Sequence, residues 1–137
     1  MRGAFLAALL TAGAAVAAPQ EQVVLDRIDR DAAPNAKLAD SIWSYAELGY
    51  QESRSSAALQ ARLKAEGFRV EAGVAGMPTA FTASYGSGGG PVIAILGEFD
   101  ALPGFSQAAT PGKQAQPGMT SGHACGHHLF GVGSASA

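Results

Sequence analysis

The residues most able to do chemistry include a short run at 123–128, which reads His-Ala-Cys-Gly-His-His. This run offers one thiol and three imidazoles within six residues. Thiolate and imidazole are the groups with which proteins bind zinc and similar ions. Gly126 separates Cys125 from His127 and lets the backbone bend, so that both side chains can converge on one ion. The run is therefore a candidate metal site.

Two carboxylates precede this run along the chain. Glu98 and Asp100 follow residues 92–96, an apolar stretch of strand length without alternating polar residues. Such a stretch is typical of a strand buried on both faces of a sheet. Ligands gather at the carboxyl ends of strands in open α/β sheets, so we expect both carboxylates to lie near the metal site. A mixed set of carboxylate, imidazole and thiolate is closer to catalytic than to structural zinc.

Two other chemistries remain open for the same residues. Cys125 could be the nucleophile of a thiol hydrolase, which needs a histidine packed against the sulfur from elsewhere in the fold. His127 is only two residues away and is poorly placed for that role. Alternatively, the chain could be a non-catalytic metal-binding module. The glycines at 86–90 do not indicate a phosphate-binding loop, because no Gly-Lys-Ser/Thr and no helix follow them.

Helices are predicted in the first half of the chain. Apolar residues at three- and four-residue spacing indicate helices over 21–31 and from Ala36 to a stop near Gly49. Pro34 is expected to interrupt or kink this region. A further helix is predicted over 53–67, with Ser53 as its cap.

The pattern changes to strands after that helix. Alternation predicts strands over 68–72 and 79–85, and residues 92–97 are expected to form the central strand. Residues 102–122 read as a long surface loop, and residues 129–137 have weak helical character. The predicted fold is α/β, with helices followed by a mixed sheet and helices packed on it.

The composition limits which classes of protein this chain can belong to. The chain has 137 residues, of which 47% are hydrophobic and 15% charged, and its net charge is −2. This is the size of one domain and is too apolar for a disordered chain. No cluster of Lys and Arg is present, so a nucleic-acid partner is not expected. No membrane span is predicted past the N-terminus.

The N-terminus has the features of an export signal. Met1 and Arg2 are followed by an apolar run over 4–16 and by Ala-Val-Ala at 15–17, a small-x-small cleavage site. We therefore expect residues 1–17 to be a signal peptide and residues 18–137 to be the mature chain. The expected location is periplasmic or secreted.

Four blocks of this sequence resemble one family of metallopeptidases and amidohydrolases. They are GEFDALPG at 97–104, GHACGHHLFG at 122–131, IWSYAELGYQES at 42–53 and GVAGMPTAFTASYG at 73–86. The family includes aminoacylases, aminoacyl-amino-acid hydrolases and p-aminobenzoyl-glutamate hydrolase. The last two blocks are most similar to the branch of the hydrolase B subunit. The resemblance runs from about Val24 to Ala137 and implies a zinc-peptidase-like catalytic domain.

The resemblance implies roles for three residues. Cys125 and His127 match the Cys and His metal ligands of the family's motif. Asp100 matches the Asp that sits by the metal and orients a ligand or polarises the catalytic water. A complete member would hold two divalent ions, commonly zinc or manganese, and no organic cofactor is expected.

Three neighbouring positions are possible additional site residues without an assigned role. Glu98 stands where other branches of the family have a ligand histidine. Relatives often have Asp or Asn at the position of His128, and His123 carries no ligand role in the motif.

The resemblance also implies that this chain is an N-terminal part, over 18–137, of a truncated catalytic domain. Family members are longer and carry a later Glu-Glu pair, of which the first is the general base and the second a metal ligand. The complete protein is expected to hydrolyse the amide bond of N-acyl or N-aminobenzoyl amino acids. It is expected to be a homodimer or hetero-oligomer. The fragment is expected to be inactive and to leave strand edges exposed.

Overall fold

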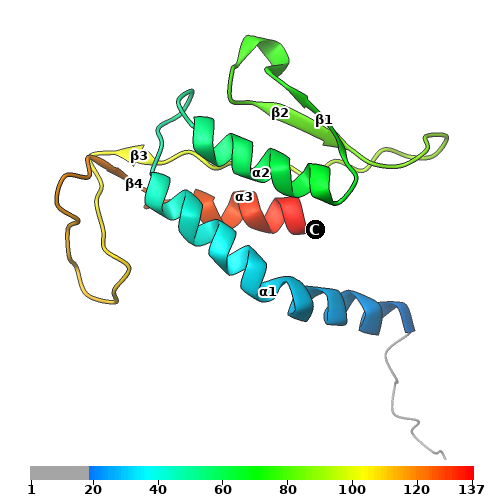
Figure 1. The fold of residues 1–137 in the computed structure, drawn as a ribbon, viewed down its shortest axis with the longest axis horizontal. Coiled ribbons are helices and arrows are strands. Elements are labelled where there is room, and N and C mark those ends of the chain that lie inside the picture. Colours follow the sequence, from blue (N-terminus) through cyan, green and yellow to red (C-terminus); the bar gives the residue numbers. More distant parts are fainter. Residues whose placement is uncertain (1–18) are drawn as a thin grey trace, which may run out of the picture. The chain divides into compact units, whose positions relative to one another are not determined.

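The computed structural model describes residues 19–137 (Figure 1). The predicted signal peptide lies outside the described residues. Residues 19–31 and residues 32–137 belong to separate compact units, and every site discussed below lies in the second. No helix in the described part of the chain is both long and apolar enough to cross a membrane. In chain order the elements are α1 (Pro19–Tyr45), α2 (Ser53–Ala65), β1 (Arg69–Ala72), a 3-10 turn (Val74–Gly76), β2 (Phe81–Ser84), β3 (Leu102–Pro103), β4 (Ser121–Gly122) and α3 (His127–Ser136).

Helix α1 is longer than the sequence predicts. It continues through Pro34, so the expected interruption at this residue is wrong. Proline has no backbone N–H, so the helix lacks one hydrogen-bond donor at this residue. The helix ends at Tyr45, before the expected stop at Gly49, because Ala46 adopts a left-handed φ of 43°.

The start of α2 is capped by a residue from outside the helix. The helix begins at Ser53, but Ser53 is not its cap. The carboxylate of Glu47 accepts hydrogen bonds from the backbone N–H groups of Arg54 (3.1 Å) and Ser55 (2.9 Å), and from the Ser55 hydroxyl (2.8 Å). Burial would raise the pKa of Glu47, but these bonds together lower it below its ordinary value. The predicted Ser53 cap is therefore replaced by a longer-range one.

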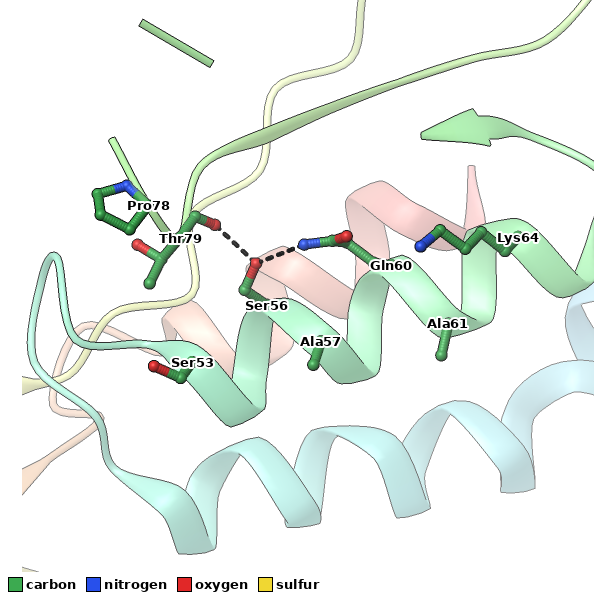
Figure 2. Close-up of a pocket in the computed structure, with 8 residues that line it drawn as sticks. All are labelled: Ser53, Ser56, Ala57, Gln60, Ala61, Lys64, Pro78 and Thr79. Atoms are coloured by element: carbon green, nitrogen blue, oxygen red, sulfur yellow. Dashed lines mark hydrogen bonds between the residues drawn. The ribbon is translucent and has the colours of Figure 1, made fainter. Parts of the chain in front are cut away.

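The two strands predicted after α2 are confirmed. Strands β1 and β2 form an antiparallel pair in which Arg69 lies opposite Ser84 and Ala72 opposite Phe81. The hairpin is tied to α2 by the Ser56 hydroxyl, which donates to the Thr79 carbonyl over 2.6 Å (Figure 2). A second two-stranded sheet joins β3 to β4 across the ends of the predicted loop over 102–122.

The core lies among the three helices of the second unit. Its buried members come from the C-terminal half of α1, from α2 and from α3, and the aromatic side chains of Phe81 and Phe99 pack against it. The two phenyl rings stack with their centroids 6.0 Å apart. This core brings the segment around Phe99 against α3. The buried members are Ala39, Ile42, Leu59 and Val132.

The expected central strand over 92–97 does not form among the residues that the structure describes. This segment has no assigned strand, and Val92 and Ile93 are 95% and 86% exposed. The α/β class is confirmed, but two small antiparallel sheets stand in place of the mixed sheet. A strand needs neighbouring strands to pair its backbone groups, and the described residues supply none beside 92–96. The Ser134 hydroxyl donates to the Leu96 carbonyl over 2.7 Å and holds the end of the segment.

Candidate metal centre

The segment over 97–100 reaches α3 through a contact between small residues. A Cβ added at Gly131 would lie 2.9 Å from the Glu98 carbonyl oxygen and 3.1 Å from the Phe99 Cβ. A Cβ added at Gly97 would lie 3.0 Å from the Ser134 Cβ. Glycine is therefore required for this close approach. The approach brings the side chains of Glu98 and Asp100 to the first turn of α3.

His127 is the first residue of α3. Gly126 precedes the helix with a left-handed φ of 77°, a conformation that glycine adopts without strain. Immediately beyond this bend, the His127 ring lies between two carboxylates. Its Nε2 atom is 3.0 Å from Oε2 of Glu98, and its Nδ1 atom is 2.8 Å from Oδ1 of Asp100.

Glu98, Asp100 and His127 form a group of potential metal ligands. Each offers one ligand atom, and these atoms all lie within 4.8 Å of one another. The side chains are 50%, 34% and 19% exposed respectively, so the cluster opens to solvent on its Glu98 side. Carboxylate oxygen and imidazole nitrogen are donors that suit zinc, and manganese prefers the oxygens. The residues present therefore fit the divalent ion that the sequence predicts.

Cys125 is not brought into this cluster. It lies on the turn before Gly126, and its thiol is free and exposed. Among the described residues, the group that could hold an ion contains the two carboxylates and one imidazole and no sulfur. The role of Cys125 as a metal ligand stays a prediction.

His123 and His128 lie on the core side of the same turn. His123 is 5% exposed, and its Nε2 atom is 3.0 Å from the carbonyl oxygen of Ile42. The His128 and Trp43 rings form a T-shaped pair, with centroids 4.9 Å apart. Burial lowers the pKa of both histidines, and at His128 the neighbouring His123 lowers it further. Neither ring joins the cluster around His127.

The residues that support the cluster are not indicated by the sequence. Gly131 and Ser134 hold the 97–100 segment against α3, yet neither has a side chain that binds a metal. The only signal for them is the run of small residues over 131–137, which predicts no more than weak helical character.

A groove along α2 lies apart from this chemistry. It is lined by residues of α2 together with Pro78 and Thr79, and none of the predicted site residues lines it (Figure 2). Two of its polar side chains bond to each other, since Gln60 donates to the Ser56 hydroxyl over 3.0 Å. The groove therefore lies where α2 packs against the turn of the β1–β2 hairpin.

Comparison with known proteins agrees with the motifs. No family model matches the chain. Over 120 residues the chain is 40% identical to the B subunit of p-aminobenzoyl-glutamate hydrolase from Escherichia coli (strain K12), a match that covers 82% of this chain and 23% of that protein. Over 122 residues it is 35% identical to the Xaa-Arg dipeptidase of Mus musculus, covering 82% of this chain and 25% of that protein. The chain is a relative of amidohydrolases and peptidases. The resemblance predicted from the four blocks is thereby confirmed, and the chain spans about a quarter of the length of these relatives.

Proposed function

We propose that this chain contributes to a metal-dependent hydrolase that cleaves the amide bond of N-acyl or N-aminobenzoyl amino acids. The single observation that carries the proposal is the position of His127 between the carboxylates of Glu98 and Asp100. The names of the two relatives, one a component of p-aminobenzoyl-glutamate hydrolase and the other a dipeptidase, support the reaction class. The matched segment is 23% and 25% of these relatives, so the proposal assigns the activity to a longer protein.

Asp100 orients the metal-binding ring in this proposal. Its Oδ1 atom accepts a hydrogen bond from Nδ1–H of His127, which leaves the lone pair of Nε2 for an ion. Glu98 supplies an oxygen on the same side, and Cys125 is the predicted sulfur ligand. When bound, zinc or manganese would acidify a water molecule and polarise the scissile carbonyl. We assign no general base within this chain, because the family resemblance places that base in the later Glu-Glu pair.

The proposed substrate is a small molecule with a free carboxylate, as in p-aminobenzoyl-glutamate. The proposal includes export to the periplasm or the medium and assembly of the complete protein as a homodimer or hetero-oligomer. It includes neither nucleic acid nor an organic cofactor among the partners.

The test measures metal content and amide hydrolysis in the complete gene product that contains this chain. Hydrolysis of p-aminobenzoyl-glutamate should be lost on chelation, restored by zinc or manganese, and lost in His127→Asn. The 137-residue chain alone should bind metal without turnover, since it lacks the proposed base. Activity that survives chelation but is lost when Cys125 is alkylated in the metal-loaded protein would support the thiol hydrolase instead. Metal binding without turnover by the complete gene product would support the non-catalytic module.

A further inference from the structure

His123 and His128 each carry a ring nitrogen for which residues 19–137 supply no hydrogen-bond partner. The Nδ1 atoms of both residues are buried and have no hydrogen-bond partner. The two rings are neighbours, with centroids 5.1 Å apart and planes inclined by 50°. Buried polar atoms without partners are uncommon, because desolvation is then uncompensated, and they mark places where a water or an ion binds.

The hydrogen bond of His123 determines which of its nitrogens is free. Its Nε2 atom lies 3.0 Å from the Ile42 carbonyl oxygen, and a carbonyl can only accept. Nε2 therefore carries the hydrogen, and Nδ1 presents a buried lone pair. Histidines that bind metals are held in this way, with the second ring nitrogen donating to a carbonyl or a carboxylate.

The spacing of the two rings suits a shared ion. A metal bound about 2.0–2.1 Å from one nitrogen of each ring, at a tetrahedral ligand angle, holds the ring centres about 5 Å apart. The observed separation is 5.1 Å. Asp40 is near enough to act electrostatically on His128, and its negative charge favours a cation here. The Trp43 ring packs against the His128 ring in a T-shaped arrangement.

We propose that His123 and His128 bind a divalent transition-metal ion of the kind that prefers imidazole, such as zinc or nickel, through their Nδ1 atoms. This site shares no residue with the cluster of Glu98, Asp100 and His127, although Asp100 and His127 act electrostatically on His123. It does not depend on the proposed hydrolase function. Two imidazoles supply two ligands, and the remaining positions would be filled by groups other than these two residues.

Trp43 provides a reporter for this ion. It is the only tryptophan in the chain, and its ring centroid is 4.9 Å from that of His128 and 6.4 Å from that of His123. A nickel ion bound to these two histidines should therefore quench the indole fluorescence. We expect saturable quenching by Ni²⁺ in the natural chain, loss of it in His128→Asn and His123→Gln, and retention of it in His127→Asn. Circular dichroism of each variant checks that the helices persist.

Three results would overturn the proposal. They are the absence of quenching in the folded natural chain, equal quenching in His128→Asn, and quenching that is lost only in His127→Asn. The first would leave a buried water as the partner of the two nitrogens. A second measurement needs no substitution: zinc should shift the imidazole ¹⁵N resonances assigned to Nδ1 of His123 and His128. If both variants unfold, unchanged Nδ1 resonances at saturating zinc would refute the site.

Discussion

Asp100 holds the imidazole of His127 at two points. The Nδ1 atom of His127 lies 2.8 Å from the carboxylate oxygen Oδ1 of Asp100 and 3.2 Å from the backbone carbonyl oxygen of the same residue. Both partners accept, so Nδ1 carries the hydrogen and Nε2 faces Glu98. The direction of the ring is thus controlled by the segment over 97–100 as well as by α3. Asp100 and His127 are 27 positions apart in the sequence, and this hydrogen bond joins them directly.

Removing the Asp100 side chain should weaken metal binding without removing the imidazole. We expect Asp100→Ala to lower the affinity for Mn²⁺ by about 10–100-fold, the usual loss when a partner that orients a metal ligand is removed. Isothermal titration with Mn²⁺ measures the affinity, since carboxylate oxygens suit this ion better than a pair of imidazoles does. Asp29→Ala, at an exposed position of α1, is the matched control and should bind normally. Equal affinity in both variants would show that Asp100 does not support the site.

The exposed thiol of Cys125 offers a direct test of its predicted ligand role. It is the only cysteine of the chain, so a thiol-reactive dye reports on it alone. In metal-free protein the dye should react readily. Zinc should slow the reaction by at least about tenfold, because a thiolate that binds a metal is a poor nucleophile toward the dye. His127→Ala should abolish this protection. A labelling rate that zinc leaves unchanged would remove Cys125 from the ligand set.

Two glycines of α3 form a matched pair. Gly131→Ala places a Cβ 2.9 Å from the Glu98 carbonyl, so the segment over 97–100 must move away. We expect a loss of about 1–3 kcal/mol in the free energy of unfolding, the usual cost of overpacking, together with weaker Mn²⁺ binding. Gly133→Ala meets nothing within 4 Å and should be neutral or stabilise the helix by up to about 1 kcal/mol. Urea unfolding and Mn²⁺ titration of both variants check this. Equal effects at the two positions would contradict the close contact.

The cap that Glu47 provides to α2 should make stability depend on pH. Glu47→Ala removes four hydrogen bonds, one of them from the Arg54 guanidinium, and should cost about 1–2 kcal/mol in the free energy of unfolding at neutral pH. Because the native fold lowers the pKa of Glu47, its contribution is complete above the ordinary value of 4.5. It is lost as the pH falls through the lowered pKa.

The measurement is urea unfolding of the natural chain and of Glu47→Ala, at neutral and at acid pH. The difference between the two proteins should shrink in acid. Glu71→Ala, at an exposed position of β1, is the control and should show a small difference at either pH. A difference that persists in acid would show that the cap does not act through the carboxylate.

Local patterns predict those elements whose hydrogen bonds are made within a short stretch. The β1–β2 hairpin and the helix at the C-terminal end of the sequence are both indicated by nearby residues. The cap of α2 is not, since Glu47 folds back from a separate loop while Ser53 has the more usual cap chemistry. The prediction of a strand over 92–97 is wrong for a related reason. Its apolar residues favour a strand, but no neighbouring segment of the described chain pairs with it.

The candidate site also combines features that nearby residues predict with features that depend on distant ones. Residue types suggest His127, Asp100 and Glu98 as candidate site residues, and the structure places one ligand atom of each within 4.8 Å of the others. Spacing along the sequence favours the nearby pair of Cys125 and His127, whereas the observed partners of His127 are 27 and 29 positions away. Their approach depends on the absence of a side chain at Gly131, which no pattern of ligand residues encodes.

The exposed apolar segment over 92–96 has a consequence for handling the protein. No charged residue occurs between Glu71 and Glu98, so no charge in this stretch opposes pairing with the same segment of another molecule. Such pairing is second order in protein concentration, whereas folding of a single molecule is first order. Dilution should therefore favour the dispersed chain, and slow synthesis should raise its soluble yield more than a lower temperature at the same concentration.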